Sequence, residues 1–208
     1  MTLLYCFCRR TAYFCFSAFG RLEVIGREIV PPYGPLIVVS NHISHNDAAA
    51  LIASFSRPLN FLGKQELFRT PVHRLVMEQL GVYPVRRLGT SLEGIRGALK
   101  LLAQGRAVAI FPEGVIGSGL SLREGQLGAA YLAVKSQAPI IPVGIIGTEK
   151  FPPWRMPFPL QRIQVRMGRP FTPLIPEGKP DRRVLARVRD MIMQHIAILL
   201  LRGPNEIN

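Results

Sequence analysis

His42 and Asp47 are the two residues of this 208-residue sequence whose types and spacing best suit chemistry. On one continuous helix, residues five apart would lie about 140° apart around the axis and face different directions. The spacing suits a reaction if His42 lies in a loop and Asp47 in the first turn of the helix that follows. The carboxylate then binds one imidazole nitrogen and leaves the other as a general base, as in two members of a Ser-His-Asp triad.

The third member of that triad, a nucleophilic serine, is not part of the pattern. A His-Asp pair without a nucleophile fits an acyl donor that is already activated, such as a thioester. The enzyme then needs only to take the proton from the incoming alcohol, and no covalent intermediate is required. General-base catalysis of this kind supplies about 10²–10⁴ in rate, so positioning and oxyanion stabilisation must supply the rest.

Two other interpretations of the pair stay open from the residues alone. A histidine beside an aspartate is often a hydrogen-bonded loop residue without a catalytic role. His42, His45 and Asp47 are also residue types that bind metal ions. No second acidic or histidine cluster follows them, and His73 and His195 belong to helical patterns. We therefore expect neither a bound metal nor an organic prosthetic group.

Hydrophobic patterning predicts the elements that would position the pair. Residues 35–40 are a short β-branched run typical of a buried strand, and residues 47–54 are predicted to be helical. His42 would then follow the carboxyl end of a strand, where parallel sheets bind ligands. Further strands are expected at 59–62, 82–85, 107–111, 139–146 and 163–167, and further helices at 70–81, 90–105, 126–136 and 181–201. This alternation predicts a single α/β domain with a mostly parallel sheet flanked by helices.

The first twenty residues are apolar but are divided by Arg9 and Arg10, which leaves an uninterrupted run of ten residues from Thr11 to Gly20. A membrane span needs about 20 residues. One prediction is a helix that lies in the membrane interface, with its arginines reaching the headgroups. The alternative is a helix that packs on the body of the protein.

The chain is strongly basic, with 26 Lys and Arg against 13 Asp and Glu and a formal net charge of +13. Such an excess attracts nucleic acid, an anionic membrane surface or a phosphorylated substrate. The arginines are scattered and match no nucleic-acid-binding motif. We therefore expect a membrane surface and not nucleic acid as partner, and a non-catalytic basic module is the alternative.

Residues 41–47, NHISHND, resemble the Asn-His-x-x-x-x-Asp signature of the glycerolipid acyltransferase family, whose prototype is 1-acyl-sn-glycerol-3-phosphate acyltransferase. In that family the histidine is the base and the aspartate orients it, and these roles map onto His42 and Asp47. Three further blocks follow in order: GVYPVRR at 81–87, FPEG at 111–114 and APIIPV at 138–143. The four blocks lie in register within roughly residues 25–175. Together they indicate the family far more specifically than any one block does.

The resemblance implies an enzyme that moves a fatty-acyl group from a thioester donor to the free hydroxyl of 1-acylglycerol-3-phosphate, giving phosphatidic acid. The donor would be carried on coenzyme A or on acyl carrier protein. A basic residue of the second block would contact the acceptor's phosphate, and Glu113 and Gly114 would shape the acceptor pocket. Arg86 and Arg87 follow an extended segment and should point to opposite sides, so we expect at most one of them, Arg87 in preference, to face the pocket.

The apolar composition of the first twenty residues and the extent of the resemblance together suggest a division of the chain. Residues 1–20 would be a membrane-associating segment and residues 21–208 the acyltransferase domain. The protein would be peripheral or monotopic on the cytoplasmic face of a membrane.

The third block departs from the family pattern. After Phe-Pro-Glu-Gly the family usually continues Thr-Arg-Ser, whereas residues 115–117 are Val-Ile-Gly. A charged contact with phosphate is therefore absent at that position. Either Arg86, Arg87 or Arg123 takes its place, or the acceptor is a lysolipid other than 1-acylglycerol-3-phosphate.

Overall fold

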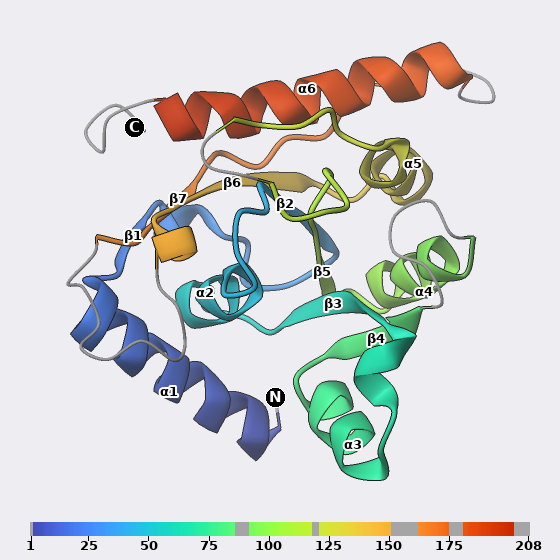
Figure 1. The fold of residues 1–208 in the computed structure, drawn as a ribbon. Coiled ribbons are helices and arrows are strands. Elements are labelled where there is room, and N and C mark those ends of the chain that lie inside the picture. Colours follow the sequence, from blue (N-terminus) through green and yellow to red (C-terminus); the bar gives the residue numbers. More distant parts are fainter. Residues whose placement is uncertain (1, 86–91, 118–120, 151–161, 175–180, 202–208) are drawn as a thin grey trace.

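A seven-stranded sheet in the order β1-β7-β6-β2-β5-β3-β4 runs through the middle of the protein (Figure 1). The computed structural model describes residues 2–85, 92–117, 121–150, 162–174 and 181–201. The strands are β1 (Glu23–Ile25), β2 (Leu36–Ser40), β3 (Leu59–Lys64), β4 (Val82–Val85), β5 (Ala107–Ile110), β6 (Ile140–Ile146) and β7 (Gln164–Met167). Among these strands β6 and β7 pair antiparallel and the other neighbours pair parallel. The predicted mostly parallel α/β sheet is confirmed.

Helices cover both faces of the sheet (Figure 1). One face carries α1 (Leu3–Gly20) and α2 (Asp47–Ser54), and the other carries α4 (Leu92–Ala103), α5 (Leu127–Ser136) and α6 (Arg182–Leu201). Helix α3 (Pro71–Gln79) lies beside β4. Short 3-10 turns occur at η1 (Arg27–Ile29), η2 (Gln65–Phe68) and η3 (Thr148–Lys150).

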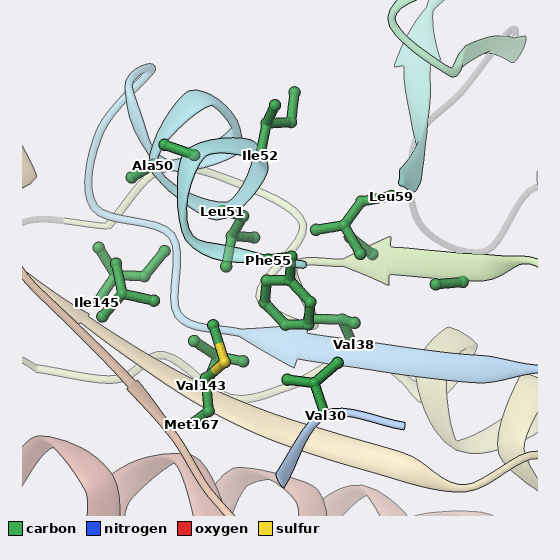
Figure 2. Close-up of a cluster of buried hydrophobic side chains, with 14 of the residues drawn as sticks. Val30, Val38, Ala50, Leu51, Ile52, Phe55, Leu59, Val143, Ile145 and Met167 are labelled. Carbon is green, nitrogen blue, oxygen red and sulfur yellow. The ribbon is translucent and has the colours of Figure 1, made fainter. Parts of the chain in front are cut away.

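Strand β2 is buried along its whole length because both of its faces are covered. Leu36 and Val38 face the α2 side, where they join an apolar cluster with residues of α2. Figure 2 shows Val38 of this cluster beside Leu51 and Phe55. The alternate residues of β2 join a second cluster, against α5 and α6. Each large side chain buried in this way contributes roughly 1.5–3 kcal/mol to stability. The two clusters therefore hold β2 rigidly, and its carboxyl end is a fixed point from which the next loop starts.

Helix α1 packs on the body of the protein through one face. Tyr5 and Phe16 are buried, and the hydroxyl of Tyr5 accepts a hydrogen bond from the backbone N–H of Leu59 over 3.0 Å. Burial raises the pKa of the Tyr5 phenol above its ordinary value. The other face of the helix exposes large apolar side chains, among them Phe7 and Phe14. Packing on the protein is therefore confirmed, and the membrane association of residues 1–20 stays a prediction.

No helix within the described part of the chain combines the length and the apolar character that crossing a bilayer requires.

Candidate active site

The loop between β2 and α2 is anchored where the chain leaves the sheet. Asn41 is buried, and its side-chain amide donates to the carbonyl oxygen of Ile145 over 2.8 Å. Its amide oxygen accepts from the backbone N–H of Ile145 over 2.7 Å. The side chain thus continues the pairing between β2 and β6 for one more position, and it fixes the backbone just before His42.

His42 and Asp47 meet across this loop. His42 lies in the loop and Asp47 begins α2, as the sequence predicts, and Nδ1 of His42 is 2.8 Å from Oδ2 of Asp47. Asp47 is fully buried, whereas the His42 side chain is 20% exposed. An ionised carboxylate accepts hydrogen bonds and donates none, so in the neutral ring the contact favours a proton on Nδ1 and leaves Nε2 unprotonated.

Further contacts fix both partners of the pair. Oδ2 of Asp47 also accepts the backbone N–H groups of Ile43 and Ser44, over 2.7 and 2.8 Å. The imidazole of His42 stacks on Phe111, with ring centroids 4.1 Å apart and planes 14° from parallel. The ring is therefore held at one edge by the carboxylate and on one face by an aromatic side chain.

Glu113 ties the His42 loop to the loop that follows β5. It is buried, and its Oε1 accepts the backbone N–H of His42 over 2.9 Å. Its Oε2 accepts the backbone N–H of Arg123 over 2.9 Å. The backbone N–H of Gly117 also donates to the carbonyl oxygen of His42 over 2.7 Å. Both carboxylate oxygens thus hold the site's backbone, and direct contact of Glu113 with an acceptor stays a prediction.

Gly114 needs to be glycine because of its backbone conformation. Its φ of 72° lies in the left-handed region that side-chain-bearing residues rarely adopt. The side-chain amide of Gln126 lies directly over its Cα. The residue thereby brings the turn after β5 close to the start of α5, and it lines a cavity beside His42.

That cavity is apolar and has a volume of about 110 Å³. It lies between β3, β5, α4 and α5, and His42 forms part of its wall. Its larger apolar side chains are Phe61, Leu62, Ile95, Ile110, Phe111 and Leu132. The composition is that expected for a pocket that receives a hydrocarbon chain.

The remaining predicted site residues have separate outcomes. Arg86 and Arg87 lie outside the described residues. Arg123 is described and exposed, in the loop whose backbone Glu113 holds. Val115 and Ile116, which stand where a phosphate contact was expected, are 48% and 36% exposed. Within the described residues, no three His, Cys, Asp or Glu side chains come together as a metal site.

Sequence reasoning missed two residues of the site, Asn41 as an anchor and Thr148 as a partner of Asp47. The hydroxyl of Thr148 donates to Oδ1 of Asp47 over 2.5 Å. Thr148 follows β6, whose carboxyl end lies at the same edge of the sheet as that of β2. A polar residue just after a neighbouring parallel strand was the signal that could have identified Thr148.

Comparisons with known proteins agree with this arrangement. A 1-acyl-sn-glycerol-3-phosphate acyltransferase of Borreliella burgdorferi is 31% identical over 133 residues, which are 63% of this chain and 53% of that protein. A probable 1-acyl-sn-glycerol-3-phosphate acyltransferase of Mycoplasma genitalium is 33% identical over 137 residues, which are 62% of this chain and 50% of that protein. The chain thus spans about half the length of these curated relatives.

A solved structure shares the fold. The crystal structure of the 1-acyl-sn-glycerophosphate (LPA) acyltransferase from Thermotoga maritima matches with a TM-score of 0.72 and 24% sequence identity. The match covers 96% of this chain and 79% of that one. Residues 21–146, which include His42, Asp47 and Glu113, match the family model described as Acyltransferase. The chain therefore belongs to the acyltransferase family.

Proposed function

We propose that the protein transfers a fatty-acyl group from a thioester donor to the free hydroxyl of 1-acylglycerol-3-phosphate, giving phosphatidic acid. The observation that carries the proposal is the 2.8 Å contact between His42 and Asp47, beside an apolar cavity that His42 lines. The names of the Borreliella and Mycoplasma relatives support the choice of acceptor.

The chemistry follows from the protonation of the pair. Nε2 of His42 takes the proton of the acceptor hydroxyl as that oxygen attacks the carbonyl carbon of the thioester. A new C–O ester bond forms, the C–S bond breaks, and the imidazolium returns its proton to the departing thiolate. Asp47 stabilises the imidazolium between these two transfers, because its carboxylate stays hydrogen-bonded to Nδ1.

The apolar cavity explains how the acyl chain could be held beside this base. Its wall contains His42 and Phe111, so a chain inserted between α4 and α5 leaves its carbonyl carbon near the imidazole. Binding the chain in a fixed place converts a bimolecular encounter into an oriented reaction, which supplies much of the rate acceleration in such enzymes.

A different lysolipid acceptor is the second candidate. Val115 and Ile116 are exposed beside the loop that Glu113 holds, where the family pattern has a charged residue. An exposed apolar pair does not neutralise a phosphate monoester, so this position favours an acceptor with a less charged headgroup. Arg123, exposed in the same loop region, supports the first candidate instead.

One experiment separates these candidates. Purified protein is incubated with mixed acyl thioesters on coenzyme A and on acyl carrier protein, and with a panel of lysolipids, and the products are identified by mass spectrometry. Phosphatidic acid as the main product supports the first candidate. Acylation of another lysolipid in preference supports the second, and absence of any acylated product rejects the proposed chemistry.

We also propose that α1 brings the enzyme to a membrane surface. Its exposed face carries Leu3, Phe7 and Phe14, and Arg10 is exposed beside them. A pocket of about 180 Å³ next to this face is lined by Arg9, Arg10 and Arg27 together with Tyr13 and Ala53. Aromatic side chains and arginines on one face match the acyl and phosphate layers of an anionic membrane.

A further inference from the structure

Thr148 is fully buried and contacts the proposed catalytic pair from a distant part of the sequence. Its hydroxyl lies 2.5 Å from Oδ1 of Asp47, 101 positions away along the chain. The preceding residue, Gly147, has a φ of 90°, and a side chain there would collide with the carbonyl oxygen of Arg162. The turn after β6 therefore depends on glycine, and this turn delivers Thr148 to the carboxylate.

The two oxygens of Asp47 have different partners. Oδ2 is bound by His42 and by two backbone N–H groups of the loop. The described partner of Oδ1 is the Thr148 hydroxyl. Because Asp47 is fully buried, bulk water does not replace a lost donor at Oδ1. A buried charged oxygen without a donor is strongly unfavourable, so the carboxylate would rotate to share its remaining donors.

We propose that Thr148 is a positioning residue for acyl transfer, which acts by donating its hydroxyl to Oδ1 of Asp47. The inference rests on the proposed function, because it assigns Thr148 a part in that chemistry. The hydroxyl holds the plane of the carboxylate so that Oδ2 stays on Nδ1 of His42. The imidazole thereby keeps its proton on Nδ1 and presents Nε2 to the acceptor hydroxyl. No bond of Thr148 is made or broken in the reaction.

The kinetic test compares Thr148→Val, which has nearly the same shape but no hydroxyl, with Thr148→Ser, which keeps it. We expect Thr148→Val to lower kcat by roughly 10- to 100-fold. This is the rate factor that corresponds to the loss of one hydrogen bond to a charged group. We expect KM for donor and acceptor to change by less than about twofold, because Thr148 is fully buried and presents no surface to either substrate. Thr148→Ser should restore most of kcat.

The matched control is Ser54→Ala at the far end of α2. Ser54 is as buried as Thr148, and its hydroxyl has no hydrogen-bond partner among the described residues. Its removal should leave kcat unchanged. If Thr148→Val does not fold, Thr148→Cys replaces it, because a thiol of similar size is a weaker donor. Wild-type kcat in the folded variant would overturn the proposal.

A second readout does not depend on turnover. In protein labelled with 15N-histidine and held at alkaline pH, the ring nitrogen shifts report which nitrogen carries the proton, and His42→Ala assigns the signal. We expect the Nδ1–H tautomer of His42 in wild type and a mixture of tautomers in Thr148→Val. An unchanged tautomer contradicts the inference. A changed tautomer in a protein that acylates no lysolipid supports the positioning role and rejects the proposed function.

Discussion

The carboxylate of Glu113 holds the backbone of His42, with Oε1 accepting its N–H over 2.9 Å. The other oxygen accepts the N–H of Arg123, so one buried side chain joins the loops after β2 and β5. Neither loop is regular secondary structure, and His42, the proposed base, lies in the first of them. The position of the imidazole therefore depends on a residue 71 positions away as well as on Asp47.

Glu113→Gln should lower both the free energy of unfolding and kcat. One acceptor oxygen becomes an NH₂ group that faces a backbone N–H donor, so one buried hydrogen bond is lost and two donors oppose each other. We expect a loss of about 1–3 kcal/mol in the free energy of unfolding, measured by urea denaturation, together with a lower kcat.

The charge-matched control for Glu113 is Glu124→Gln. Glu124 is exposed and makes a surface ion pair with Arg189 at 2.6 Å. Surface pairs of this kind contribute about 0–1 kcal/mol, so stability and kcat should change little. Equal effects of the two substitutions would mean that Glu113 matters only through its charge.

His42→Ala should abolish acyl transfer without unfolding the protein. The ring is partly exposed and contacts one aromatic side chain, so little apolar packing is lost. Removal of a general base should lower kcat by at least about 10²–10⁴-fold. The measurement is thioester-dependent acylation under saturating donor and acceptor, with circular dichroism and binding of the acceptor as checks on folding.

His45→Ala serves as the control for this variant. His45 is exposed in the same loop, three residues from His42. Its removal should leave turnover near the wild-type level. A His42→Ala protein that still turns over at nearly the wild-type rate would show that His42 is not the base.

The part of the site formed by β2, α2 and the loop between them could be predicted, because each of these elements is encoded by its own neighbouring residues. The β-branched run before Asn41 and the apolar pattern after Asp47 place β2 and α2 within one residue of their observed bounds. The loop between them then follows, and so does the contact of His42 with Asp47. Burial on both faces also marks β5 and β6 clearly, since neither alternates with polar residues.

Other features depend on contacts that a local pattern does not contain. Strand β1 has three half-buried residues, too few to give a periodic signal, and it is defined by pairing with β7. The antiparallel direction of β7 is likewise a property of its pairing with β6 and not of its own residues. Thr148 is chemically ordinary in the sequence, and its role comes from a partner 101 positions away.

Ile95→Phe tests the apolar cavity as the site of the acyl chain. Ile95 lines the cavity from α4 and is only partly buried, so a larger ring should enter the cavity at little cost to the core. We expect kcat/KM to fall for long acyl donors and to change little for short ones. Competition between donors of different length, read by mass spectrometry, measures this preference.

Leu99→Phe is the control for the cavity. Leu99 is also partly buried on α4, one turn further along, and is not among the described residues that line the cavity. This variant should keep the wild-type donor preference. A shift of equal size in both variants would assign the effect to α4 as a whole and not to the cavity.

Arg10→Gln tests the proposed membrane face of α1. Arg10 is exposed on α1 and lines the pocket of about 180 Å³ that also contains Arg9 and Arg27. Arg183→Gln removes the same charge from α6, which lies on the opposite face of the sheet (Figure 1). If α1 faces the membrane, Arg10→Gln should weaken binding to vesicles that contain anionic phospholipid, by about 1 kcal/mol for one basic residue near the surface.

The control substitution Arg183→Gln should weaken vesicle binding much less at physiological salt. If α1 faces the membrane, Arg183 would lie more than a Debye length of about 8 Å from the bilayer. Vesicle co-sedimentation over a salt series distinguishes the two variants, and neutral vesicles show the part of binding due to the exposed Phe7 and Phe14. Equal weakening by both substitutions would mean that net charge, and not the face of α1, drives membrane binding. A stronger effect of Arg183→Gln would place α6 at the membrane and reverse the proposed orientation.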